Sequence, residues 1–95
     1  MRADVLAGIL EANGVPVKSS EEPCEDDSCG YVHIEGNYQV ILDGKFNHLI
    51  YREPCSGGAF LPYSKSDYLV TVEGYISTYV LATVIREAYF DSKAA

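Results

Sequence analysis

The sequence predicts a single small α+β domain in which an antiparallel sheet of three to four strands is flanked by an N-terminal and a C-terminal helix. Its 95 residues form one domain, residues 1–95, because a chain of this length supports one core only. Apolar residues recur at helical spacing near both ends. Between these ends, short runs of alternating apolar and polar residues are separated by turn residues, as in strands.

Two helices are expected. The first runs from about Arg2 to Asn13 and ends before Pro16, with a stripe formed by Val5, Leu6, Ile9 and Leu10. The second runs from Ile76 to about Phe90. Many of its residues are β-branched, which lowers helix propensity, so a strand over 76–90 stays an alternative.

The strands are expected at residues 31–35, 38–42, 46–52 and 68–73. For the hairpin at Asp43-Gly44 we favour a loop of odd length with Gly44 in the left-handed region. This register places Phe46, His48 and Ile50 on the same face as Tyr38, Val40 and Leu42. The reverse face then carries Ile41, Leu49 and Tyr51, which indicates a covered or partner-binding face. A two-residue Asp43-Gly44 loop is the alternative.

Two loops complete the chain. The acidic loop covers about residues 18–29, where Pro23 and mutual repulsion between carboxylates disfavour a packed helix or central strand. A second loop, at about residues 54–66, is rich in Gly, Ser and Pro and is therefore expected to be flexible.

The net charge of −7 is confined to one segment. Between Ser19 and Gly44 there are seven acids and no Lys or Arg, whereas the rest of the chain holds seven acids and seven bases. Such a chain repels phosphate backbones and anionic membranes, so we expect neither direct nucleic-acid binding nor membrane binding. A protein with a basic surface is the favoured partner.

The chain contains no apolar stretch of about 20 residues, and Asp4 interrupts the region where a signal peptide would be apolar. We therefore expect a cytoplasmic protein. The cysteine count is three, and reduced thiols are the simplest interpretation of an odd number. Whether Cys24 and Cys29 pair is left open.

The cysteines and histidines offer two alternatives, a metal site and a thiol enzyme. Thiolate and imidazole groups could bind zinc, but the ligand spacing matches no common zinc motif; the residues concerned are Cys24, Cys29, Cys55, His33 and His48. Cys55 could also act as a nucleophile with His48 or His33 as the base, although no local signature surrounds it. We expect no enzyme activity, no metal and no cofactor.

Tyrosines accompany the acidic segment. Tyrosine offers a large contact area and a hydroxyl group at small entropic cost, which favours binding interfaces. We therefore predict a non-catalytic inhibitor or adaptor that occupies a basic surface, such as a nucleic-acid-binding one, and that is a monomer or a homodimer. The predicted partner-binding residues are Glu21, Glu22, Glu25, Asp26, Asp27, Tyr31, Glu35, Tyr38, Asp43 and Tyr51.

In its overall profile of one short, acidic, aromatic domain without catalytic motifs, the chain resembles small phage-encoded inhibitors of host defence, including anti-CRISPR proteins. The resemblance implies a location in the host cytoplasm. It also implies binding to a CRISPR effector, with inhibition by DNA mimicry or by steric block.

Overall fold

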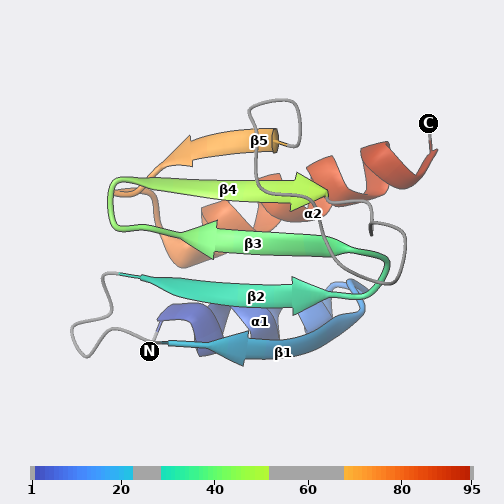
Figure 1. Ribbon diagram of the computed structural model, residues 1–95, viewed down its shortest axis with the longest axis horizontal. Helices are drawn as coiled ribbons and strands as arrows, with labels where there is room; N and C mark the ends of the chain where they lie inside the picture. The colour runs from blue at the N-terminus through green and yellow to red at the C-terminus, as the bar shows by residue number, and fades with distance from the viewer. Residues whose placement is uncertain (1, 23–28, 52–67, 95) are drawn as a thin grey trace, which may run out of the picture.

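The computed structural model describes residues 2–22, 29–51 and 68–94. Two helices flank a five-stranded antiparallel sheet with the strand order β1-β2-β3-β4-β5, an α+β arrangement. Both helices lie on the same side of the sheet (Figure 1). The elements are α1 (Arg2–Ala12), β1 (Val17–Glu21), β2 (Gly30–Ile34), β3 (Tyr38–Leu42), β4 (Phe46–Tyr51), β5 (Tyr68–Glu73) and α2 (Thr78–Ala94).

The fifth strand was not expected from the sequence. β1 occupies the start of the predicted acidic loop, and its residues pair with β2 from Val17↔Ile34 to Glu21↔Tyr31. This strand was missed because only Val17 is apolar, so no alternation is visible. An edge strand needs few apolar side chains, since one neighbouring strand supplies its pairing. Residues 23–28 of that loop and the predicted flexible loop at 54–66 lie outside the described residues.

The helices agree with the predicted positions. Residues Thr78–Ala94 form the helix α2, so the strand alternative for residues 76–90 is wrong. The helix begins after Ser77, whose hydroxyl accepts a hydrogen bond from the backbone N–H of Val80 at 3.2 Å. This is N-capping, which supplies an acceptor to a first-turn N–H that has no partner inside the helix. In α1 the buried residues are Ala3, Leu6, Ala7 and Leu10, whereas Val5 is 50% exposed and lies off the predicted stripe.

The predicted register of the β3–β4 hairpin is wrong. Leu42 pairs with Asn47 and Val40 with Leu49, and the backbone N–H of Asp43 donates to the Phe46 carbonyl at 3.1 Å. The loop is therefore Gly44-Lys45, with Gly44 at a φ of 88° in its first position. An even loop reverses the faces assigned to β4, because side chains alternate along a strand.

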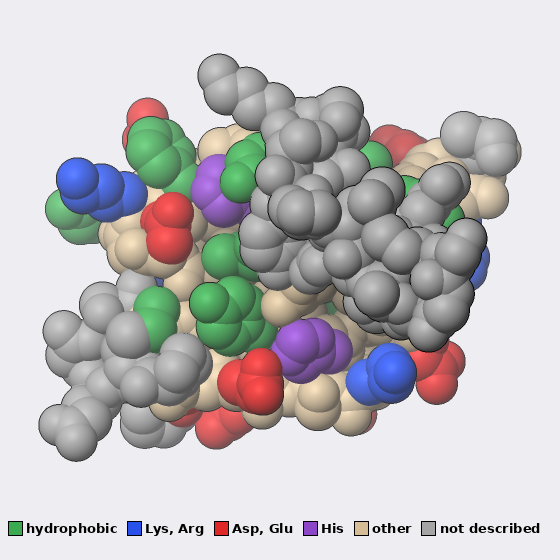
Figure 2. Space-filling view, viewed as in Figure 1, with side chains coloured by type: hydrophobic (Ala, Val, Ile, Leu, Met, Phe, Trp, Pro, Cys, Tyr) green, Lys and Arg blue, Asp and Glu red, His purple; other side chains and the backbone are tan. Residues whose placement is uncertain are grey.

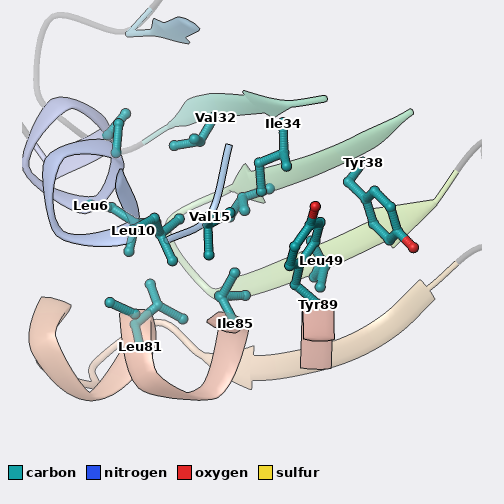
Figure 3. Packing of buried hydrophobic residues seen from close by; sticks show 14 of the residues in the cluster. Leu6, Leu10, Val15, Val32, Ile34, Tyr38, Leu49, Leu81, Ile85 and Tyr89 are labelled. Carbon is teal, nitrogen blue, oxygen red and sulfur yellow. The ribbon is translucent and has the colours of Figure 1, made fainter. Parts of the chain in front are cut away.

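The core lies between the sheet and the helices (Figure 3). Tyr38 and Leu49 point into it from the sheet, and Leu81, Ile85 and Tyr89 meet them from α2. The Tyr38 and Tyr89 rings pack edge to face with their centroids 4.9 Å apart. Both helices of the described residues pack on this side of the sheet, and neither of them covers the other side.

One buried side chain is polar. Asn47 is fully buried, and its Nδ2 atom donates to the carbonyls of Val72 at 3.4 Å and Glu73 at 3.1 Å. Its Oδ1 atom has no hydrogen-bond partner in the described part of the chain. Asn47 thus ties β4 to the end of β5.

Candidate protein-binding face

The outer face of the sheet, on the side away from both helices, is the candidate site. The pairing registers place one row across the sheet, Glu21, Tyr31, Ile41, His48 and Thr71, from β1 to β5. Figure 2 views this side and shows both histidines, with hydrophobic and acidic side chains beside them. By the same registers, the outer-face side chains are Ser19, Glu21, Tyr31, His33, Gln39, Ile41, Phe46, His48, Ile50, Tyr68, Thr71 and Glu73, of which Ile50 is fully buried.

His33 is held by a carboxylate of the neighbouring strand. Its Nε2 atom lies 2.8 Å from Oε2 of Glu21, and its ring stacks on Tyr31 with centroids 6.4 Å apart. The Glu21 side chain is 61% exposed and the His33 side chain 34%. Because one carboxylate oxygen remains accessible, Glu21 can still accept a hydrogen bond from a cationic group of a partner.

His48 is more enclosed, with a side chain that is 12% exposed. Its Nδ1 atom lies 3.0 Å from the hydroxyl of Thr71, and Nε2 lies 3.7 Å from Oδ2 of Asp43. Its ring lies against that of Tyr68, with centroids 4.7 Å apart. Contacts from β5 and from the β3–β4 turn therefore fix the ring in place on β4.

Asp43 is a fixed negative charge beside His48. Burial by itself raises the pKa of this carboxyl. The hydrogen bonds from the backbone N–H groups of Phe46 and Lys45 and the neighbouring His48 lower it by more than burial raises it, so the pKa of Asp43 lies below its usual value. The two N–H groups donate to Oδ1 at 2.6 and 3.0 Å. The same hydrogen bonds close the turn, so Asp43 has a structural role as well as a charge.

The predicted acidic residues are divided by the fold. Glu21 lies on the outer face and Asp43 and Glu35 in the turns at the two ends of β3. Glu22 lies elsewhere: its Oε1 atom accepts from the N–H of Ala3 at 2.9 Å, at the start of α1. The other three, Glu25, Asp26 and Asp27, lie outside the described residues.

The predicted tyrosines are divided in the same way. Tyr31 lies on the outer face, but Tyr38 is 8% exposed in the core, where its hydroxyl hydrogen-bonds that of Ser92 at 3.0 Å. Tyr51 packs against this core, with its ring centroid 5.2 Å from that of Tyr38. Tyr38, Leu49 and Tyr51 all belong to the inner side, so the expected reverse face of Ile41, Leu49 and Tyr51 is divided and only Ile41 lies on the outer side.

Sequence reasoning missed the outer-face roles of Phe46, His48, Tyr68 and Thr71. The alternation of residues along β4 shows which of its side chains share a face. Which of the two faces points outward depends on whether the hairpin loop has an even or an odd number of residues. Phe46 is 45% exposed and Tyr68 37%, and both flank His48, whose centroid lies 6.3 Å from that of Phe46. Together they form an aromatic cluster at the β4–β5 side of the face.

The groups considered for zinc or thiol chemistry are separated. Across residues 2–22, 29–51 and 68–94, no three His, Cys, Asp or Glu side chains are grouped so as to hold a metal ion. Cys29 is disulfide-bonded, so the expectation of reduced thiols is wrong at this position. Cys24 and Cys55 lie outside the described residues, and the thiol hypothesis with them.

No family model, curated protein or solved structure matches the chain. In the described residues, neither helix combines the length and the apolar character needed to span a bilayer.

Proposed function

We propose that the protein is a non-catalytic protein-binding domain, an inhibitor or adaptor, whose outer sheet face docks on a basic surface of a partner protein. The observation that carries this proposal is the composition of the face. Aromatic and aliphatic side chains occupy its centre, and carboxylates lie toward its margins, where Figure 2 also shows Lys or Arg side chains.

The apolar part of the face supplies contact area. Phe46 and Tyr68 are the most exposed aromatic side chains on it, and Tyr31 and Ile41 continue the surface toward β1. Aromatic side chains are enriched at the centres of protein interfaces, where they lose little conformational entropy on binding.

The charged part of the face selects the partner. The Glu21 side chain is 61% exposed and that of Asp43 47%, and Glu73 is exposed at the end of β5. Carboxylates at the margin of an interface speed association with a basic partner and repel acidic ones. If that basic surface normally binds nucleic acid, the protein would compete with the nucleic acid, as the resemblance to host-defence inhibitors implies.

The test compares retention of proteins from a cell lysate on four immobilised variants at low salt. The variant Phe46→Ala/Tyr68→Ala removes apolar area from the outer face, and Glu21→Gln/Glu73→Gln removes two charges. Tyr79→Ala and Glu11→Gln/Glu87→Gln make the matching changes on the helices, where Tyr79 is 73% exposed and both glutamates are exposed.

A specific partner should be retained by the wild type and by both helix variants but lost from both face variants. It should be released as salt is raised from roughly 0.05 to 0.5 M, because the attraction between exposed charges is screened. The proposal would be overturned if the face variants still retained the partner, or if the helix variants lost it. Displacement of the captured partner by a nucleic-acid oligomer would identify the nucleic-acid-binding class.

A further inference from the structure

One carboxylate of the outer face is held in place by a ring on the neighbouring strand. Nε2 of His33 lies 2.8 Å from Oε2 of Glu21. An ionised carboxylate only accepts hydrogen bonds, so Nε2 is the donor of this contact. Each carboxylate oxygen has two acceptor sites, and the Glu21 side chain is 61% exposed. Glu21 therefore presents an oriented carboxylate that can accept further hydrogen bonds from a partner.

An aromatic ring lies beside this carboxylate. Glu21 pairs with Tyr31 across the β1–β2 ladder, and the Tyr31 ring stacks on that of His33 with 25° between the ring planes. Directly opposite residues have Cβ atoms about 5 Å apart on the same face of a sheet. Tyr31 is half-buried, so it stays partly accessible. A carboxylate and an aromatic ring thus share one small area of the face.

The position of this pair in the sheet leaves it open to a partner. β1 is an edge strand, and Ser19, which pairs with His33, is small and exposed. Neither helix of the described residues covers this side of the sheet. A partner side chain can therefore reach the pair from above the sheet or past the β1 edge.

Asp43, the other carboxylate beside a histidine, is less available. Its Oδ1 atom already accepts from the N–H groups of Lys45 and Phe46, and its Oδ2 atom lies 3.7 Å from Nε2 of His48. A cationic group at Asp43 would compete with the hydrogen bonds that close the turn. Its side chain is also less exposed than that of Glu21, at 47% against 61%.

We propose that Glu21 and Tyr31 form a binding site for an arginine side chain of the partner protein, with His33 as the residue that positions the carboxylate. The site rests on the proposed function, because it names the group through which a basic surface is recognised. The guanidinium donates two parallel N–H bonds to the carboxylate of Glu21 and lies against the ring of Tyr31.

Arginine fits this site better than lysine does. The planar guanidinium matches an oriented carboxylate with two N–H groups at once, and its plane stacks on an aromatic ring. A cation within about 6 Å of the ring centroid is also attracted by the ring. The lysine ammonium is a compact, strongly hydrated charge that gains less from an oriented carboxylate or a stacked ring. The site should therefore distinguish two cations of equal charge.

The experiment compares two probe peptides of equal charge, hexaarginine and hexalysine, by isothermal titration calorimetry at roughly 0.05 M salt. Long-range attraction to a chain of net charge −7 acts alike on both peptides, so the ratio of their dissociation constants isolates the site. The wild type should bind hexaarginine about three- to tenfold more tightly. Glu21→Gln and Tyr31→Leu should each bring the ratio close to one.

The positioning role of His33 has its own readout. His33→Leu removes the N–H donor but leaves the charge of Glu21, so the ratio should fall while the affinity for hexalysine stays unchanged. His33→Gln keeps an N–H donor and should restore the ratio toward that of the wild type. A ratio that both His33 variants leave at the wild-type value would show that the carboxylate needs no positioning.

The control is Glu87→Gln, which removes one exposed carboxylate from α2, in the helix layer. It should weaken both peptides alike and keep the ratio. Circular dichroism verifies folding, and Glu21→Gln decides the outcome if Tyr31→Leu does not fold. A wild-type ratio near one would overturn the arginine site, even where the outer face retains the lysate partner. The same conclusion follows if Glu87→Gln lowers the ratio as much as Glu21→Gln. Retention of that partner by Phe46→Ala/Tyr68→Ala, in contrast, overturns the proposed function whatever the ratio.

Discussion

The carboxylate of Glu22 caps the first helix by accepting a hydrogen bond from the backbone N–H of Ala3 at 2.9 Å. The N–H of Asp4 lies 3.4 Å from the same Oε1 atom. A second contact supports this corner, where the Ser20 hydroxyl donates to Oδ1 of Asp4 at 2.6 Å. The end of β1 is thereby joined to the start of α1, and part of the acidic segment stabilises the fold.

Glu22→Ala should therefore lower the free energy of unfolding by about 1 kcal/mol, because the first-turn N–H groups of α1 lose their acceptor and the favourable charge at the helix start. Glu22→Gln keeps an acceptor oxygen and should lose less. Urea unfolding at neutral pH measures both. Equal stability of the alanine variant and the wild type would show that water replaces the carboxylate at no cost.

Asp43 should make stability depend on pH in the acidic range. A carboxyl whose pKa is lowered by folding stabilises the native state above its unfolded-state pKa, and this contribution is lost as the pH falls through the native pKa. The advantage of the wild type over Asp43→Asn should thus be present at pH 7, begin to decrease below about pH 4 and disappear only as the pH falls through the lower native pKa. It should be at most about 1 kcal/mol, since the side chain is 47% exposed.

Chemical unfolding of both proteins from pH 7 downward measures this difference. Asparagine keeps an oxygen that can accept from the N–H groups of Lys45 and Phe46, so the comparison isolates the charge. Asp43→Ala removes the turn hydrogen bonds as well and should be less stable than Asp43→Asn at every pH. A constant gap between wild type and Asp43→Asn would contradict the lowered pKa.

Two glycines should respond in opposite directions to alanine. At Gly74 a Cβ atom would lie 2.6 Å from the carbonyl oxygen of Gly44, so Gly74→Ala must displace the backbone of the β3–β4 turn and should cost about 1–3 kcal/mol. At Gly8 nothing lies within 4 Å of the added Cβ, and alanine should stabilise α1 by about 0.5–1 kcal/mol. Thermal unfolding of both variants checks the pair, and a stable Gly74→Ala protein would show that the two turns are not in close contact.

The sequence predicted most of the local elements. Helical spacing located α1 and α2, and alternation located β2 to β5 within a few residues, because both patterns are set by neighbours in the chain. β1 escaped notice because its pairing with β2, rather than its own residues, makes it a strand. A mainly polar segment carries no local signal of this kind.

The candidate site was less predictable, since it depends on register. Phe46 and His48 were expected on the same face as Tyr38 but lie on the opposite, outer side, while Tyr51 was expected on the reverse face and lies on the inner side with Tyr38. The two-residue loop Gly44-Lys45 decides this exchange. The carboxylate of Asp43 accepts hydrogen bonds from the N–H groups of Lys45 and Phe46, so the turn closes between Asp43 and Phe46 and not, as expected, between Leu42 and Phe46. A change in loop parity reverses which side of β4 faces the helices.

By itself, the sequence determined that this protein has two amphipathic helices, a meander of strands and an acidic central segment, since composition and periodicity are local properties. Only the tertiary structure decided which side of the sheet the helices cover, which acid caps α1 and which side chains of β4 face outward. These outcomes depend on contacts between residues far apart in the chain, such as Glu22 with Ala3 and Gly74 with Lys45, and no local pattern encodes such contacts.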